Sequence, residues 1–293
     1  MMTSMRFIAL VTVGALGWTA SAPADTLNFT CDHGWWYDPD CWDAGRIPTA
    51  SDDVRIDYPR VCNVGGGDAV CRSFVLGPSN YAGTLTLSDA GTLTFSEPSY
   101  ILGEIGPGRI IFQENDTALK TSSPTAEIRG PGGEIVGQHA TARIIVDNPP
   151  SGLGKLVCKV PVRGILKIEG TGEFVNEGGV TAEGGTLIVG PLGTLGDKQG
   201  DMWLVREPNS TLLFVGTGAE AILSGNFVMD MTADSTSLIK IDRSLSTNGR
   251  LKMTAGVLDV NEDVFMGNET AGNFAEITGG KIDVEPGKKF EHR

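Results

Sequence analysis

A short pattern returns along the chain at a nearly constant interval. Each copy is a glycine followed by alternating apolar and polar residues, as in residues 256–260 (GVLDV) and 280–284 (GKIDV), which lie 24 residues apart. Gly164 and Gly185 open two comparable segments that lie 21 residues apart. Such alternation is typical of a strand with one buried face, and a phase that returns after about 20 to 25 residues indicates a solenoid.

The composition favours strands over helices. The chain has 40 glycines and 15 prolines in 293 residues, and these residue types destabilise a helix interior by about 1 and 3 kcal/mol respectively. One coil of a β-helix uses the observed interval when three short strands are joined by tight corners, where glycine supplies positive φ. The sequence therefore predicts an all-β fold, a single-stranded right-handed parallel β-helix. The alternative is an antiparallel β-sandwich, which also has short strands but does not explain the constant phase.

The alternation also predicts which residues face the core. We expect the apolar members of three segments to point inward. They are Leu166 and Ile168, Leu187 and Val189, and Leu251 and Met253.

The beginning of the chain carries the pattern of a secretory leader. Residues 7–18 form an uninterrupted apolar run after Arg6, and small residues follow at Ala20, Ala22 and Ala24. The run is too short for a membrane span, so we expect cleavage near Ala22 or Ala24. A segment rich in aromatic residues, Asp and Cys then gives way near residue 83 to glycine-punctuated strands. The predicted organisation is a signal peptide (1–24), an N-terminal cap with the first coil (25–82) and a β-solenoid (83–293).

All five cysteines lie in the part predicted to be exported, where disulfides form readily. Cys62 and Cys71 flank a glycine turn and would meet across a hairpin or corner, and Cys31 and Cys41 would then close the segment between them. This local pairing is the one we expect among the three that four cysteines permit. Cys158 follows an apolar alternation and is predicted to be a buried free thiol.

Four aromatic residues gather near the start of the predicted mature chain: Trp35, Trp36, Tyr37 and Trp42. Exposed aromatic rings stack on sugars, so these residues are candidates for glycan binding. The first coil of a solenoid also has an open apolar end that must be covered. We favour a disulfide-pinned N-terminal cap, and the two roles do not exclude each other.

The net charge and the small number of histidines exclude several classes of partner and activity. A net charge of −13 disfavours nucleic acid, anionic membranes and polyanionic substrates as partners. The three histidines, His33, His139 and His292, lie far apart in sequence, and no Gly-x-Ser-x-Gly motif occurs. The spacing of Cys and His predicts no metal site, and no motif predicts a cofactor.

Carboxylates on neighbouring coils are the remaining acid–base candidates. The nearest pairs are Asp38 with Asp40, Asp52 with Asp53, Asp230 with Asp234, and Asp259 with Asp283. Outward carboxylates also make a solvated face, so we predict no enzymatic activity. A polysaccharide lyase or glycoside hydrolase is the alternative.

Two parts of the chain resemble a known class of exported protein. Residues 254–268 and 275–284 resemble the glycine-rich β-strand repeats of bacterial autotransporter passengers, and residues 36–56 are similar to a segment found at the start of such β-helices. The resemblance implies an exported bacterial β-solenoid and is specific for architecture rather than activity. The sequence shows no C-terminal membrane barrel, so the resemblance does not imply self-translocation.

These patterns together predict a secreted, non-catalytic protein with a structural or adhesive role at the cell surface or in the extracellular matrix. The periplasm is the alternative location. The expected partners are surface glycans or other extracellular proteins, and no membrane insertion is expected after the leader is removed. The alternative function is a carbohydrate-binding or polysaccharide-degrading β-helix protein.

Overall fold

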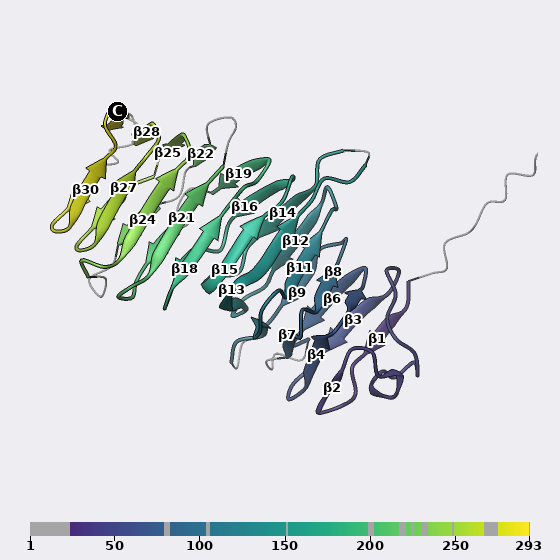
Figure 1. Cartoon of the computed structure of the whole chain (residues 1–293). Coiled ribbons are helices and arrows are strands. Elements are labelled where there is room, and N and C mark those ends of the chain that lie inside the picture. Colours follow the sequence, from purple (N-terminus) through teal and green to yellow (C-terminus); the bar gives the residue numbers. More distant parts are fainter. Residues whose placement is uncertain are drawn as a thin grey trace, which may run out of the picture.

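The chain forms a β-solenoid of about 10 turns, in which the strands stack in order from β1 to β31 (Figure 1). The computed structural model describes residues 24–78, 83–103, 106–150, 152–198, 202–216, 221–223, 226–229, 234–247, 249–266 and 275–292. All but the last residue of the predicted leader lie outside this range. None of the described residues belongs to a helix long and apolar enough to cross a bilayer.

The strands of successive turns form three faces, each a parallel ladder. The first face contains β1 (Thr26–Asn28), β3 (Asp53–Ile56), β6 (Ser73–Leu76), β9 (Ser99–Ile101), β12 (Ala126–Arg129), β14 (Lys155–Cys158), β16 (Glu173–Asn176) and β19 (Thr194–Asp197), and then β22 (Ala221–Leu223), β25 (Leu245–Thr247), β28 (Val264–Met266) and β31 (Phe290–His292).

The second face contains β2 (His33–Trp35), β4 (Val61–Gly65), β7 (Thr84–Ser88), β10 (Arg109–Phe112), the first halves of β13 (Glu134–Val146) and β15 (Val162–Glu169), β17 (Val180–Ala182), β20 (Met202–Val205), β23 (Asn226–Met229), β26 (Leu251–Met253) and β29 (Glu276–Ile277).

The third face contains β5 (Asp68–Val70), β8 (Thr92–Thr94), β11 (Ala118–Thr121), the second halves of β13 and β15, β18 (Thr186–Val189), β21 (Thr211–Val215), β24 (Leu238–Asp242), β27 (Val257–Val260) and β30 (Lys281–Val284).

Strand pairing distinguishes the two predicted architectures. Every pairing between the described strands is parallel, and antiparallel contacts are confined to two isolated bridges. The parallel β-helix is confirmed, and the antiparallel sandwich is wrong for this chain.

The repeats found in the sequence are neighbours in space. Val257 pairs with Lys281 and Leu258 with Ile282, which gives the interval of 24 residues. Lys167 pairs with Ile188 at the interval of 21. Other turns depart from this range, from 18 residues between β14 and β16 to 30 between β12 and β14. The corners absorb this variation because strand register depends only on the paired segments.

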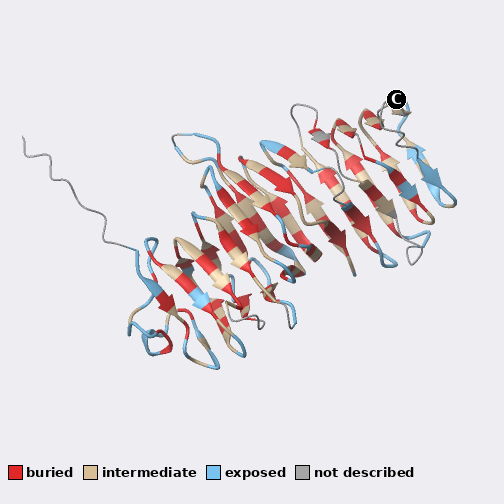
Figure 2. Ribbon diagram, turned by 180° about the vertical axis from the view of Figure 1, so that it is seen from behind, coloured by how far each residue is buried: buried red, intermediate tan, exposed pale blue. Residues whose placement is uncertain are grey.

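The core is a set of stacked apolar rows inside the three faces. The six residues predicted to point inward are all buried, with at most 1% of their surface exposed. Along the strands, buried residues alternate with partly exposed ones (Figure 2). Aromatic rings from two faces of one turn also meet edge to face, with 5.1 Å between the ring centres of Trp203 and Phe214. This packing buries every second residue of most strands, as in β15, which explains the alternation in the sequence.

The change of composition near residue 83 has no counterpart in the strand pairing. β1 already pairs with β3, and β3 with β6, in the same parallel manner as the later turns. The early turns differ in what surrounds them, because the chain between β2 and β3 includes η1 (Pro39–Cys41), the one helical element of the described residues.

Candidate functional site

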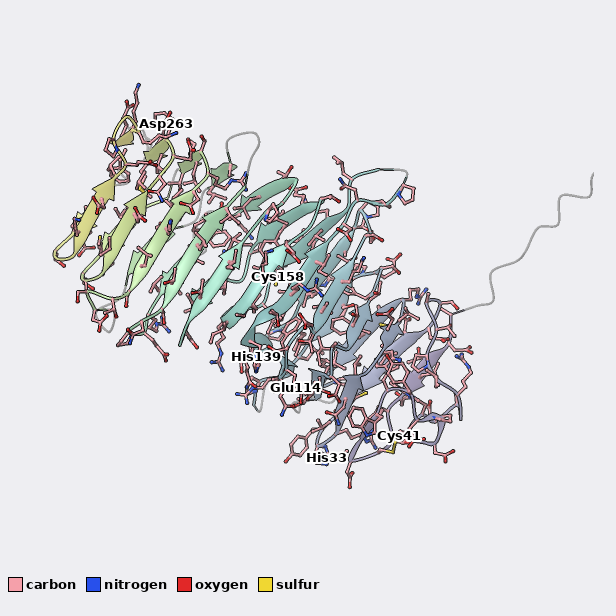
Figure 3. The ribbon with its side chains drawn as sticks, viewed as in Figure 1. His33, Cys41, Glu114, His139, Cys158 and Asp263 are labelled. Carbon is pink, nitrogen blue, oxygen red and sulfur yellow. A yellow bond between two sulfur atoms is a disulfide. The ribbon has the colours of Figure 1, made fainter. Side chains whose placement is uncertain are left out.

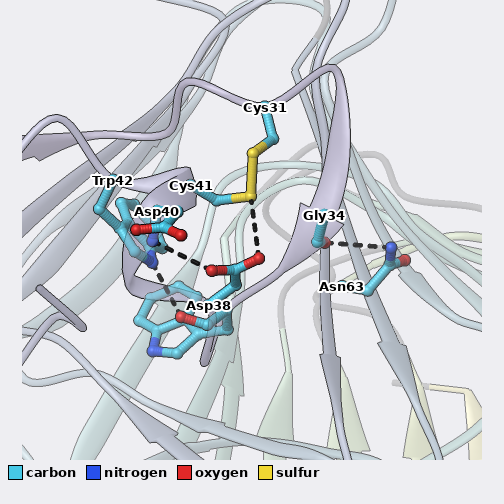
Figure 4. Close-up of a disulfide and its surroundings, with 8 residues drawn as sticks. Cys31, Gly34, Asp38, Asp40, Cys41, Trp42 and Asn63 are labelled. Atoms are coloured by element: carbon cyan, nitrogen blue, oxygen red, sulfur yellow. Dashed lines mark hydrogen bonds between the residues drawn. A yellow bond between two sulfur atoms is a disulfide. The ribbon is translucent and has the colours of Figure 1, made fainter. Parts of the chain in front are cut away.

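The N-terminal cap is built around a disulfide and buried aromatic rings. Cys31 and Cys41 form a disulfide across η1 (Figure 4). Phe29, Trp36 and Trp42 pack edge to face beneath it, with ring centres 5.1 to 5.2 Å apart. The indole nitrogen Nε1 of Trp42 donates a hydrogen bond of 2.8 Å to the carbonyl oxygen of Trp36. These side chains close the apolar end of the first turn.

The cap places the four predicted glycan-stacking residues in two different environments. Trp36 and Trp42 are 1% and 2% exposed, so neither ring can reach a sugar, and their stacking role is excluded. Trp35 is 48% exposed and Tyr37 is half-buried. β2 ends at Trp35, and a turn follows in which the backbone nitrogen of Asp38 donates to the carbonyl of Trp35 at 3.1 Å. Trp36 enters the core at this turn, while its two neighbours stay outside.

Trp35 lies on the outer surface of the second face, against Gly65 of the next turn. A Cβ atom at Gly65 would lie 2.8 Å from Cζ3 of Trp35, so glycine is what allows the indole to approach the sheet. Tyr37 lies over Gly67, also of the next turn, and its hydroxyl is buried. Burial, and then the nearby Asp68 carboxylate, raise the pKa of Tyr37. Trp35 therefore offers an open aromatic surface, and Tyr37 supports its edge of the sheet.

The predicted second disulfide does not form. Cys62 and Cys71 are free and buried, with at most 2% exposure. The prediction of a bond across a hairpin or corner was wrong. β4 and β5 do not pair with each other but with β7 and β8, one turn onward, and the corner between them leaves both thiols unbonded. Cys158 is a buried free thiol, as predicted. Burial raises the pKa of all three thiols, that of Cys158 to about 12.

The histidines do not converge. His33 lies at the N-terminal end, whereas His139 lies in the middle of the solenoid near Glu114 (Figure 3). The side chain of His292 lies outside the described part of the chain. The described residues contain no group of three or more His, Cys, Asp or Glu side chains arranged to hold a metal ion.

The predicted carboxylate pairs are bound to basic or backbone groups. Asp259 and Asp283 are register partners on adjacent turns, but Asp259 is 3.9 Å from Nζ of Lys240 and Asp283 is 2.6 Å from Nζ of Lys281. Each carboxylate thus has a lysine partner on the third face, Asp259 on the preceding turn and Asp283 within its own strand.

The other pairs have structural roles. Asp52 is buried and accepts two hydrogen bonds of 2.7 Å from Arg46. Asp53 is paired with Arg72. Asp38 accepts a hydrogen bond from the backbone nitrogen of Asp40 at the start of η1. Asp230 lies outside the described residues.

A further feature emerges on the outer surface of the second face, which is hollowed in two places. One hollow of about 260 Å³ is lined by residues that include Arg163, Thr181 and Leu204. A second, of about 520 Å³, is lined by residues that include Val228 and Lys252. All five belong to one outward row that crosses β15, β17, β20, β23 and β26 in register.

Charged side chains border this row. Arg163 donates hydrogen bonds of 2.7 Å to Glu134 and 3.0 Å to Glu183, and Lys252 lies 3.8 Å from Glu276. The sequence analysis missed this surface because its basic residues Arg163 and Lys252 lie four turns apart along the chain and form no cluster in sequence. The interval of 24 residues, applied from Val228 to Lys252, could have revealed part of it.

No family model, no curated protein and no solved structure matches the chain. Its chemistry must therefore be inferred from the two surfaces described above, the Trp35 platform at the N-terminal end and the hollowed row on the second face.

Proposed function

We propose that the protein is a secreted structural or adhesive β-solenoid of the cell surface or extracellular matrix, without catalytic activity. The observation that carries this proposal is the continuity of the three parallel ladders over about 10 turns. Stacked turns at about 4.8 Å each give a stiff body about 50 Å long, whose outer faces present side chains in rows. An exported bacterial protein of the autotransporter-passenger type would have this architecture.

The charged rows support a role in repeated weak contacts. On the first face, Glu127, Lys159, Glu177 and Lys198 alternate across successive turns, with nitrogen–oxygen distances of 2.7 to 3.9 Å. Exposed ion pairs add little to stability, typically about 0 to 1 kcal/mol each. Their regular spacing instead presents a patterned polar surface, on which many weak contacts can act together.

The N-terminal disulfide supports an extracellular location. Structural disulfides persist in oxidising compartments and are rare in the cytosol. The Cys31–Cys41 bond also pins the cap that covers the first turn. Together with the leader pattern, this favours secretion.

Attachment of protein-coated beads to immobilised extracellular proteins and polysaccharides tests the adhesive role. We expect attachment to rise more steeply than linearly with coating density, because the contacts are individually weak. Beads coated with protein unfolded by urea and then washed are the control. Attachment that is linear in density, or release of new reducing ends or unsaturated sugars from any soluble polysaccharide, would contradict the proposal.

Carbohydrate binding is the second candidate function, because Trp35 offers a half-exposed flat ring. We expect Trp35→Ala to weaken binding to a retained polysaccharide about five- to thirtyfold, since stacking provides about 1 to 2 kcal/mol, whereas Trp35→Phe keeps most of the affinity. Leu153→Ala is the control, as Leu153 is 75% exposed and lies on a distant corner. Equal binding by Trp35→Ala and Leu153→Ala, at unchanged melting temperature, would reject this surface.

A further inference from the structure

The strands at the two ends of the solenoid differ in their backbone hydrogen-bond partners. At the N-terminal end, residues 41–43 lie along the outer edge of residues 28–30, at the end of β1: the backbone nitrogen of Thr30 donates to the carbonyl of Cys41 at 2.8 Å, and that of Asp43 donates to the carbonyl of Asn28 at 3.1 Å. Phe29 and Trp42 form an antiparallel bridge in the same segment. At the C-terminal end, β29, β30 and β31 each pair only with a strand of the preceding turn among the described residues.

The hydrogen bonds between β30 and β27 show which backbone groups of β30 point to its free edge. The backbone nitrogen of Lys281 donates to the carbonyl of Gly256 at 3.0 Å, and that of Glu285 donates to the carbonyl of Val260 at 2.9 Å. Because backbone groups of alternate residues point to opposite sides of a strand, those of Ile282 and Val284 point away from β27. Both residues therefore present an N–H and a C=O group to the open edge, where they need a partner.

The side chains of β30 are self-complementary in charge. Lys281 and Asp283 flank Ile282, and their side chains are 64% and 57% exposed. If a second copy of β30 pairs antiparallel about Ile282, Lys281 lies opposite Asp283 of the partner subunit, and Asp283 lies opposite the partner's Lys281. These are non-hydrogen-bonded positions, at which opposing side chains lie closest. Parallel pairing in register would instead place equal charges side by side.

The inward side chains fit the same arrangement. Ile282, Val284 and Phe290 are partly buried and pack against the core, and Ile277 is 46% exposed. Directly opposed residues of an antiparallel pair point to the same side of the sheet, so Ile282 from each copy would face one continuous core. Pairing would thus cover apolar surface that the last turn leaves open.

We propose that the C-terminal turn is a homodimer interface, in which β30 pairs antiparallel with β30 of a second copy across a two-fold axis at Ile282. A two-fold pairing uses the same strand edge of both copies, so each β30 has one partner and association stops at two copies. The dimer has twice the length of the monomer, with an N-terminal cap at each end.

Sedimentation velocity over a range of protein concentrations tests the proposal. We expect a reversible monomer–dimer equilibrium for the unaltered protein. Asp283→Lys places lysine opposite the partner's Lys281 at two symmetric contacts and should raise the dissociation constant at least tenfold. The double change Lys281→Asp with Asp283→Lys restores opposite charges and should return the constant to within about threefold of its original value.

Asp147→Lys is the matched control, since Asp147 forms a similar exposed ion pair, with Lys120, far from the C-terminal turn. It should leave the dissociation constant unchanged. Melting temperatures establish that every variant is folded. A protein that is monomeric at all concentrations, a ladder of higher oligomers, or a double variant as weak as Asp283→Lys would each overturn the proposal.

Discussion

At the residue scale, burial decides which side chains can take part in function. Trp36 and Trp42 belong to the cap because their rings are covered, whereas Trp35 is available to a partner. Burial also keeps the thiols of Cys62 and Cys71 protonated by raising their pKa. Because the thiolate is the reactive form of cysteine, these buried residues act as small apolar core side chains.

Alkylation should therefore separate the five cysteines into two groups. In the native protein without reductant, we expect iodoacetamide to modify none of them, because the three free thiols are buried and the other two are bonded. After unfolding in urea, still without reductant, mass spectrometry should show three modifications. A single modification would mean that Cys62 and Cys71 are bonded after all.

Asp52 should make stability depend on acid pH. Hydrogen bonds from Arg46, assisted by Thr49, hold the pKa of this carboxyl well below its usual range. A group whose pKa is lowered by folding stabilises the native state above its unfolded pKa of about 3.9, and this contribution is lost as the pH falls below that value. Asp52→Asn should thus lower the free energy of unfolding by about 1 to 3 kcal/mol at pH 7.

The difference between the two proteins should shrink below about pH 4, as urea titrations at pH 7 and pH 3 would reveal. Asp25→Asn is the control, because Asp25 binds the same arginine but its side chain is 65% exposed. A penalty for Asp52→Asn that is equal at both pH values would show that the lowered pKa contributes nothing to stability.

At the element scale, the corners decide how the chain passes from one face to the next. β13 and β15 are continuous strands that serve two faces, and Gly164 in β15 has φ of 97°. A Cβ atom at Gly164 would lie 2.1 Å from the carbonyl oxygen of Gly137 in the preceding turn. Glycine is therefore required at this position for two reasons, the positive φ and the close approach of the preceding turn.

Gly164→Ala should lower the free energy of unfolding by about 1 to 3 kcal/mol, from positive φ and from this close contact. Gly152→Ala is the matched control, because a Cβ atom at Gly152 would meet nothing within 4 Å. We expect the control to change stability by less than about 0.5 kcal/mol in urea unfolding. Equal effects of the two substitutions would show that stacking at Gly164 is not restrictive.

At the scale of the whole molecule, stability is a sum over turns that contact only their neighbours. Lys155, Glu173 and Thr194 occupy equivalent positions in three successive turns of the first face. Residues 173–193 thus make one complete turn, and their removal would bring β19 next to β14 without any change of register.

Deletion of residues 173–193 should give a folded protein with the far-ultraviolet circular dichroism of the parent and a lower melting temperature. Deletion of residues 173–183 should prevent folding, because it removes β16 and β17 and leaves β18 out of register with the first face. Two deletion variants with the same circular dichroism would contradict a solenoid whose turns act as units.

The sequence by itself determined the local rules of this fold. Residues 256–260 illustrate them: a glycine marks the turn, and the alternation that follows shows which side chains point inward. The direction of a side chain follows from its place in a strand. The recurring interval then fixes that turns stack. For the same reason, the inward positions of Leu187 and Val189 were predictable, as was the cap that Cys31 and Cys41 close.

Only the tertiary structure decided which residues from different turns meet. Corner lengths vary, so the spacing between Cys62 and Cys71 could not distinguish a hairpin from a continuing coil. Likewise, the row from Arg163 to Lys252 and the open edge of β30 exist only once the turns are stacked. Which residues of two turns become neighbours depends on the lengths of the corners between them. A local sequence pattern does not contain that information.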